Sequence, residues 1–180
     1  MDEQSSTVAE AVADAPRGNA YGALAAYVKR AGAGERAALA RLTPGSLRSN
    51  EVAALSRALL FAGLQPENWR AETWLRWALV VHGIALAGHD GTGRLGQQLA
   101  RAGVAESRVT KLLTARGDAF RQLVPRILRL LASKGVSPNW FELGELVLKE
   151  SSQTGEDLER AEQSRLRIAS AYFAAQAAKA

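Results

Sequence analysis

Apolar residues recur at helical spacing along almost the whole chain. In residues 20–31, for example, Tyr21, Leu24 and Val28 fall on one side of a helix with about 3.6 residues per turn. No segment shows the sustained alternation of apolar and polar residues, rich in β-branched side chains, that is typical of a strand. The pattern therefore predicts an all-α protein, with about nine helices in a compact two-lobed bundle.

Glycine, proline and capping residues set the limits of the predicted helices. These helices cover residues 20–31, 35–42, 50–61, 71–86, 95–102, 106–115 and 118–133, followed by one that starts at Ser137-Pro138 and one that starts at Thr154. We expect the helix over 118–133 to be interrupted at Pro125, because proline cannot donate the backbone hydrogen bond of a helix interior. The segment 71–86 is apolar nearly all round, which predicts a central, buried helix.

The predicted helices divide the chain into a tail and two lobes. Residues 1–18 are small, polar and acidic, which predicts a disordered N-terminal tail. The lobes are expected at residues 19–88 and 94–178, joined by the glycine-rich segment Gly88–Arg94 into one compact unit. Within the lobes, Val52, Leu55, Leu59 and Leu60 are expected to point inward, and Leu158, Leu166, Ala169, Tyr172 and Phe173 to share one face of the last helix.

Charge is unevenly distributed along the sequence. Residues 1–15 hold four acids and no base, residues 16–134 hold 18 Lys and Arg against 7 Asp and Glu, and residues 135–180 hold 5 against 7. A basic body with acidic ends indicates a polyanionic partner such as nucleic acid. The alternative is that the composition reflects a GC-rich genome, because 18 of the 23 basic residues are Arg and Ala is abundant.

Several classes of protein are excluded or disfavoured. The chain has no Cys, so it contains neither a disulfide nor a thiolate metal site. No run approaches the roughly 18 consecutive apolar residues of a membrane span, and the first residues carry acid where a signal peptide carries positive charge. We therefore expect a soluble, cytoplasmic protein without a membrane partner.

No combination of residues predicts catalysis or a cofactor. His82 and His89 are the only histidines and Asp90 is the only acid near them, whereas a zinc site needs three or four converging ligands. Gly91–Gly96 matches the dinucleotide fingerprint, but a helix precedes it instead of a strand. We interpret it as a loop between helices, whose exposed amides offer an alternative role along phosphates.

The remaining polar and aromatic candidates have ordinary structural interpretations. Glu142 and Glu145 lie near Lys149 in a spacing typical of a solvated helix surface. Arg116 follows a predicted helix and suits the negative end of that helix. Trp74, Trp77 and Trp140 sit among Leu and Val and are expected in the core, while Trp69 lies in a loop, where a base-stacking role stays open. We therefore expect a protein that is not an enzyme.

The clearest chemical signal is a row of basic residues between positions 101 and 134. On the helix over 118–133, Arg121, Gln122, Arg126 and Arg129 occupy the arc opposite the apolar residues, and Arg108 and Lys111 flank the apolar face of the preceding helix. Outward cations with almost no acid among them predict sequence-independent contact with phosphates. The alternative is an ordinary solvated face, but such faces normally mix both signs of charge.

Several segments, in order, resemble a known family. They are Gly34–Leu42, Asn68-Trp69-Arg70, Arg94–Leu99, Glu106–Val109 with Leu112-Leu113, Leu128–Leu131, Val136–Trp140 and Ala171-Tyr172-Phe173. From about residue 34 to residue 173 the sequence resembles CasB, the small subunit of the type I-E CRISPR Cascade complex. Each segment is a weak match alone, and the order and spacing of the segments carry the resemblance.

The resemblance implies a helical, non-catalytic subunit of a ribonucleoprotein. Two copies would pack along the belly of the complex, beside the large subunit and the backbone subunits. They would support the CRISPR RNA and its duplex with target DNA, and hold the displaced DNA strand. The positions that match basic residues of the family are Arg41, Arg70, Arg108 and Arg129, which would contact phosphates.

Two other functions remain open at this point. A helical adaptor would use the basic face to bind an acidic protein and would have no affinity for nucleic acid. A helix-turn-helix regulator is the second alternative, because residues 101–129 form short helices separated by glycine. Such a regulator needs a recognition helix with residues that read base edges.

Overall fold

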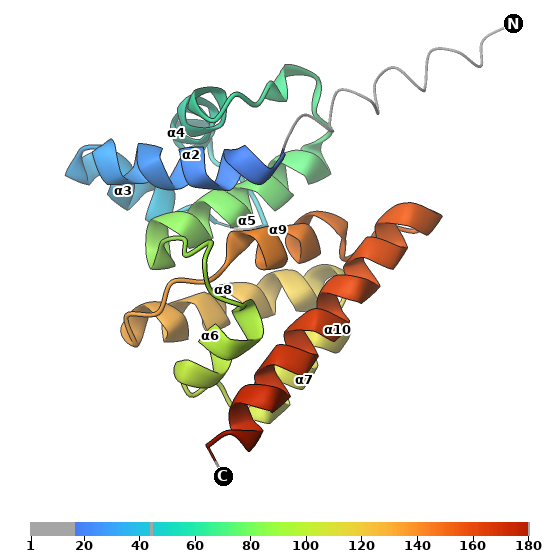
Figure 1. The fold of residues 1–180 in the computed structure, drawn as a ribbon. Helices are drawn as coiled ribbons and strands as arrows, with labels where there is room; N and C mark the ends of the chain where they lie inside the picture. Colours follow the sequence, from blue (N-terminus) through green and yellow to red (C-terminus); the bar gives the residue numbers. More distant parts are fainter. Residues whose placement is uncertain (1–16, 44, 180) are drawn as a thin grey trace, which may run out of the picture.

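The computed structural model describes residues 17–43 and 45–179, and this part is entirely helical apart from its connections. It contains nine α-helices, one short 3-10 helix and no strand, which confirms the predicted all-α class (Figure 1). The helices are α2 (Arg17–Arg30), α3 (Ala33–Ala40), α4 (Ser49–Phe61), η2 (Pro66–Asn68), α5 (Ala71–Ala87), α6 (Leu95–Arg101), α7 (Glu106–Thr114), α8 (Gly117–Ser133), α9 (Trp140–Lys149) and α10 (Gly155–Ala177). Residues 1–16 of the predicted tail lie outside the described residues, and Arg17 and Gly18 already belong to α2.

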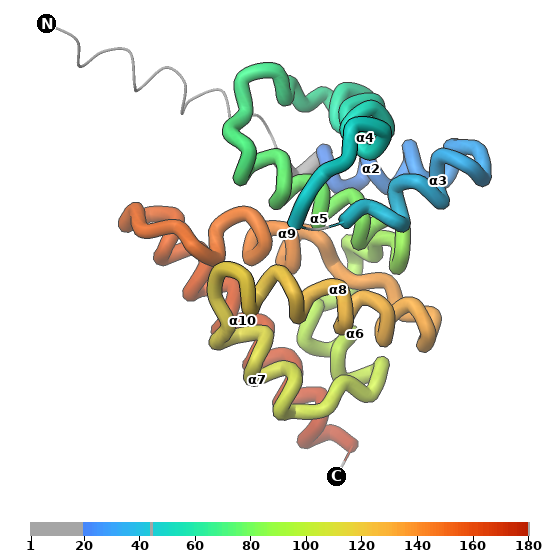
Figure 2. Tube along the Cα trace, turned by 180° about the vertical axis from the view of Figure 1, so that it is seen from behind, coloured from blue at the N-terminus to red at the C-terminus, as the bar shows by residue number. Residues whose placement is uncertain are grey.

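Helix α5 occupies the centre of the bundle. It packs against α2, α3 and α4 on one side and against α8 and α9 on the other (Figure 1). Every residue from Trp77 to Ile84 is buried, as the apolar run in the sequence predicted. Helix α10 lies along α6 and α9, whereas Figure 2 brings α7 and α8 to the front with α10 behind them.

The close contact between α6 and α10 depends on a glycine. A Cβ atom at Gly96 would overlap the backbone of α10 at the Ile168 oxygen and the Tyr172 nitrogen. Because Gly96 has no side chain, the two helix backbones can touch. The side chain of Tyr172 then reaches across the interface and donates a 2.7 Å hydrogen bond from its hydroxyl to the Val104 carbonyl.

Several predicted helix starts differ from the structure, and the start of α9 differs most in its capping. Helix α9 begins at Trp140 and not at Ser137, and its cap is Asn139, whose side chain accepts a 2.8 Å hydrogen bond from the Phe141 amide. Residues 137–138 stay outside the helix, since the Pro138 carbonyl instead accepts from the Asp90 amide. Helix α4 begins at Ser49, one residue before the predicted start at residue 50.

Helix α8 runs without a break through Pro125, where an interruption was expected. The fixed φ angle of proline is compatible with a helix, and Pro125 packs among buried neighbours. The apolar surface also differs from the prediction in two places. Leu60 is exposed and not directed inward, and in α10 Tyr172 is buried while Leu158, Leu166 and Phe173 are exposed.

Helix α10 begins after Thr154 as expected, but the Thr154 side chain does not cap it. The hydroxyls of Ser152 and Thr154 lie 3.1 Å apart and bond to each other instead.

None of the helices in the described part combines the length and the apolar character needed to cross a bilayer.

Candidate nucleic-acid interface

The predicted basic residues of α7 and α8 point away from the core. In α8, Phe120, Val124, Ile127, Leu128 and Leu131 are buried, and in α7 Val109 and Leu112 are buried. The cations on the opposite sides of these helices are all exposed: Arg108 and Lys111 on α7, Arg126 and Arg129 on α8. None of the four forms an ion pair with a carboxylate in the described part of the chain. Their charges are therefore available to a ligand.

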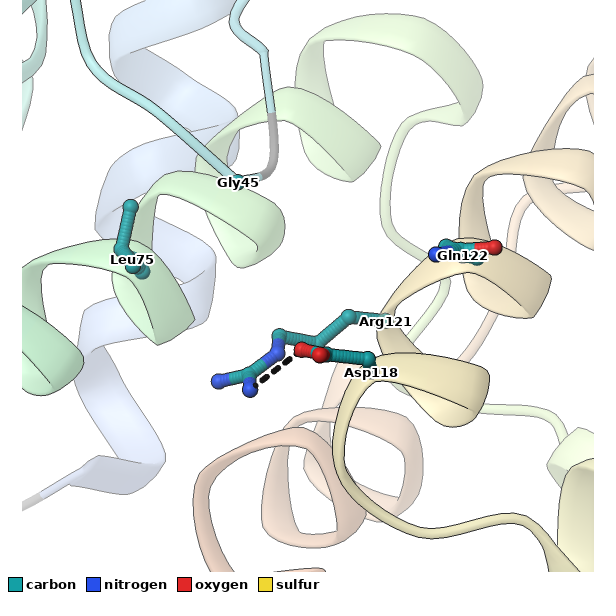
Figure 3. A pocket seen from close by; sticks show the side chains of 5 residues that line it. All are labelled: Gly45, Leu75, Asp118, Arg121 and Gln122. Atoms are coloured by element: carbon teal, nitrogen blue, oxygen red, sulfur yellow. Dashed lines mark hydrogen bonds and ion pairs between the residues drawn. The ribbon is translucent and has the colours of Figure 1, made fainter.

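Arg121 does not share this acid-free surface, although the helical wheel placed it there. Its side chain is only 24% exposed, and its guanidinium lies 2.8 Å from the Asp118 carboxylate (Figure 3). It also lies 3.5 Å from the carboxylate of Glu72 at the start of α5. Two carboxylates offset its positive charge. We therefore leave Arg121 out of the free basic surface.

The contacts of α8 with α5 show how the two helices are aligned. Arg121 meets Glu72 in the first turn of α5. Seven residues further along α8, the Leu128 side chain packs against Gly83, near the other end of α5. The two helices therefore run side by side in the same direction, and the outer side of α8 extends along the length of α5.

Helix α3 also packs against α5, and the carbonyls of its last turn act on His82. Its ring is buried, and neither ring nitrogen forms a hydrogen bond of standard geometry. Burial lowers the pKa of His82, the Arg129 charge lowers it further, and the Ala40 and Leu39 carbonyls oppose that shift. Arg129 and the end of α3 therefore both lie near His82.

Arg41 follows directly at the end of α3. It is exposed, folds back to donate from Nε to the Ala37 carbonyl at 3.0 Å, and has no carboxylate partner among the described residues. Helix α3 is distant from α8 in sequence, but its C-terminal end reaches the same side of the molecule (Figure 2). We call the set Arg41, Arg108, Lys111, Arg126 and Arg129 the basic face.

Arg70 lies apart from the Arg129 end of this surface. It is exposed and precedes the first residue of α5, whereas His82 lies about three turns further along that helix. Since α8 begins beside the same end of α5, Arg70 is near the start of α8. The two positions taken from the family resemblance alone, Arg41 and Arg70, thus lie toward opposite ends of α5.

The family comparison supplies the identification. Residues 35–173 match the family model of CRISPR-associated protein Cse2. The chain belongs to the Cse2 family. This confirms the resemblance to the small subunit of type I-E Cascade. Comparisons with curated proteins and with solved structures found no match.

The glycine-rich loop of this Cse2-family chain is held by its own carboxylates. Asp90 accepts hydrogen bonds from the Thr92 hydroxyl and amide at 2.6 and 3.0 Å, and these bonds lower the Asp90 pKa. The Glu142 carboxylate accepts from the Leu95 amide at 2.7 Å, at the start of α6. A phosphate at this position would meet two negative charges and a donor already in use. The structure therefore disfavours the alternative that the loop lies along phosphates.

Glu142, Glu145 and Lys149 do not form the solvated surface that their spacing predicted. Lys149 is 3% exposed, and its Nζ lies 2.8 Å from the Glu145 carboxylate and 3.0 Å from that of Asp157. This ion pair joins α9 to the start of α10. It was missed because Asp157 belongs to a segment without a visible sequence signal for this contact.

Arg116 lies at the C-terminal end of α7, as the sequence predicted. Its Nη1 donates to the carbonyls of Leu113 and Ala115 at 3.0 and 2.9 Å, at the C-terminus of α7. Its Nη2 also lies 3.2 Å from the Glu162 carboxylate. Arg165, which the sequence did not single out, is buried beside the same carboxylate, and burial lowers its pKa. Both arginines stabilise the junction with α10 and are not part of the basic face.

The second histidine, His89, packs against the start of α9. His89 accepts a 3.2 Å hydrogen bond at Nδ1 from the Trp140 amide and lies edge-on to Phe141, and burial lowers its pKa. Among the described residues, no three His, Asp or Glu side chains converge closely enough to hold a metal ion.

Proposed function

We propose that this chain is a non-catalytic Cascade subunit that holds nucleic acid by its sugar-phosphate backbone. Its ligands in the complex would be the CRISPR RNA paired with target DNA and the displaced DNA strand. The observation that supports this most directly is the basic face, where five exposed cations have no carboxylate partner among the described residues. Family membership provides the setting, since the chain is a Cascade subunit.

The mechanism is electrostatic. Each cation that neutralises a phosphate releases counterions, so affinity is independent of sequence and falls as salt rises. Arginine adds paired hydrogen bonds to phosphate oxygens. Opening of target DNA by a guide RNA is nearly balanced in free energy, so a few contacts with the freed strand favour the open state. The basic face would thereby stabilise the R-loop in antiviral defence.

The test is a salt titration of target-DNA binding by Cascade assembled with CRISPR RNA and this subunit. We expect Arg108→Ala and Arg129→Ala each to weaken binding and to reduce the salt slope by about one unit for each phosphate that is no longer neutralised. Arg160→Ala is the matched control, because it removes an exposed arginine of α10 that is paired with Glu156. Equal slopes for wild type and both variants would contradict the proposal.

The free protein separates the proposal from its alternatives. A backbone-binding protein should bind DNA of any sequence weakly at low salt, with a similar affinity for each sequence. An adaptor for acidic proteins would bind no DNA, and a helix-turn-helix regulator would prefer one palindromic site.

The second proposed partner is another copy of the same chain. Two groups of exposed apolar side chains suit such a contact: the α4 patch (Leu60 and Phe61) and the α10 patch (Leu158, Leu166 and Phe173). The α10 patch is accompanied by the exposed acids Glu156, Glu159 and Glu162, and the α4 patch lies near the basic end of α2. Since the patches differ in place and charge, they favour head-to-tail contact, in which one copy's α4 patch meets the next copy's α10 patch.

A further inference from the structure

An open groove lies where the first turns of α4 and α5 meet. Its volume is about 450 Å³, and its apolar lining consists of Leu47, Val52, Ala71, Trp74 and Leu75. It adjoins a smaller hollow of about 170 Å³ that shares Gly45 and Leu75 with it. The smaller hollow is bounded by three polar residues at the start of α8, Asp118, Arg121 and Gln122 (Figure 3). The combined site is therefore apolar at one end and polar at the other.

Trp74 is the tryptophan that this groove leaves accessible. Trp69 lies outside the groove lining and stacks on Trp77, with ring centroids 5.8 Å apart and an angle of 20° between the planes. Trp74 meets Trp69 edge-on at 6.0 Å and 70°, and its indole is partly exposed where it lines the groove. An exposed aromatic ring beside leucine and valine offers a stacking surface to a flat, π-bonded ligand.

The polar end of the groove suits the edge of such a ligand. Gln122 carries both a donor and an acceptor, whereas the Asp118 carboxylate and the Arg121 guanidinium are already paired with each other at 2.8 Å. Nucleobases combine flat π-faces with donors and acceptors along one edge. Apolar walls that lead to a polar end therefore match a base better than they match an aliphatic side chain.

Two exposed arginines flank the groove, and the Asp118 and Glu72 carboxylates beside it are paired with Arg121. Arg48 follows Leu47 in the chain, Arg70 precedes Ala71, and both are exposed without a carboxylate ion-pair partner in the described residues. Arg126 of the basic face lies just over one helical turn beyond Arg121 on α8. Cations thus lie on both sides of the groove and continue along α8, as a phosphate chain attached to the bound base requires.

We propose that this groove binds one unstacked base of a single nucleic-acid strand whose backbone lies along the basic face. The inference rests on the proposed function and makes it more specific, because bases in a duplex are stacked and cannot enter the groove. The basic face alone would bind single strands and duplexes through the same phosphates. The groove would add affinity for the single strand, which in an R-loop is the displaced strand.

The experiment compares two probes with the full-length protein: a short oligothymidylate and an abasic oligonucleotide of the same length and charge. We expect the base-bearing strand to bind about fivefold or more tightly, since stacking on an aromatic side chain contributes that much per base. Trp74→Ala should remove this difference and leave abasic binding unchanged, whereas Trp74→Phe should keep most of it. Phe141→Ala, which removes an exposed aromatic ring of α9 outside the groove and the basic face, should change neither affinity.

A second variant tests the groove while leaving the Trp74 side chain in place, so that a folding defect of Trp74→Ala does not decide the outcome. A Cβ atom at Gly45 would have no atom within 4 Å, so Gly45→Phe adds a ring at the groove without overlap at its Cβ. It should lower the affinity for the base-bearing strand selectively. Equal binding of the two probes by wild type would overturn this inference and leave the basic face standing, whereas no binding of either probe at low salt would contradict the proposed function itself. Unchanged DNA binding by both groove variants, with reduced incorporation into Cascade, would make the groove a protein-docking site and also overturn the inference.

Discussion

At the scale of single residues, the neighbours of an arginine decide whether it can serve a ligand. Arg121 and Arg126 lie on the same helix, five positions apart. Arg121 is enclosed by two carboxylates, and Arg126 is exposed without one among the described residues. Two nearby carboxylates offset the positive charge of Arg121, so it adds little net attraction for a phosphate.

This difference can be measured with a matched pair of variants and double-stranded DNA, whose stacked bases cannot enter the groove. Arg126→Ala should lower the salt slope of binding by about one unit, because one phosphate fewer is neutralised. Arg121→Ala removes the same charge from the same helix and should leave the slope unchanged. A larger effect for Arg121→Ala would place the phosphate path beside α5 and not along the outer side of α8.

The sequence alone supported only part of the distinction between free and paired arginines. Helical periodicity correctly separated the buried residues of α8 from its cations, since that separation depends on local geometry. It could not reveal Glu72, which reaches Arg121 from a helix 49 residues away in the chain. Nor could it reveal that the Arg129 charge and the carbonyls at the end of α3 would both act on His82.

His82 leads to a prediction about pH. Its pKa in the folded protein is lowered from 6.5, chiefly by burial. A histidine with a lowered pKa takes up protons more readily in the unfolded chain, so stability is present above about pH 6.5 and is lost as pH falls below it. Burial also lowers the pKa of His89, which adds to the loss of stability at low pH.

The variant His82→Leu should reduce this pH-dependent destabilisation, because leucine does not titrate and the histidine ring makes no standard hydrogen bond that the variant would remove. The measurement is urea unfolding at neutral pH and again about one and a half pH units lower. We expect the free energy of unfolding to fall less in His82→Leu than in wild type. An identical fall in the two proteins would mean that His82 takes up protons equally in the folded and the unfolded chain, so that burial does not lower its pKa.

At the scale of helices, most elements could be predicted and the contacts between them could not. Periodicity located all nine α-helices of the described part, to within a few residues. Local rules failed where a distant segment competed for the same group. Ser137-Pro138 looks like a helix start, but Pro138 bonds to Asp90 and Asn139 becomes the cap. Lys149 looks like a surface lysine, but α10 covers it with Asp157.

The interface between α6 and α10 gives a prediction for a single methyl group. Gly96→Ala would place a Cβ atom against the backbone of α10, which cannot move aside as a flexible side chain can. We expect it to lower the free energy of unfolding by about 1–3 kcal/mol, the usual cost of overpacking.

Gly34→Ala is the control for this prediction. Gly34 is exposed in α3, a Cβ atom there would contact nothing within 4 Å, and the substitution should stabilise the protein by up to about 1 kcal/mol. Urea unfolding of both variants measures the contrast. A Gly96→Ala protein as stable as wild type would show that α6 and α10 are free to separate slightly.

At the scale of the whole molecule, the basic face and the exposed apolar side chains have separate locations. Helices α7 and α8 form one side of the bundle, and α10 lies behind them (Figure 2). Because α10 lies behind α7 and α8, a contact at the α10 patch would leave the cations of α7 and α8 uncovered. Successive copies could then present their cations as one continuous path for a phosphate chain.

Head-to-tail contact makes a prediction that a symmetric dimer does not. Phe61→Ser damages only the α4 patch, and Phe173→Ser damages only the α10 patch, because each ring is exposed in its own patch. Each variant alone should fail to pair, since every contact requires one patch of each kind. A mixture of the two should restore pairing, because the intact α10 patch of Phe61→Ser fits the intact α4 patch of Phe173→Ser. Analytical ultracentrifugation of each variant and of the mixture measures this directly. In a symmetric dimer built on one patch, one variant would pair normally by itself and mixing would bring no recovery.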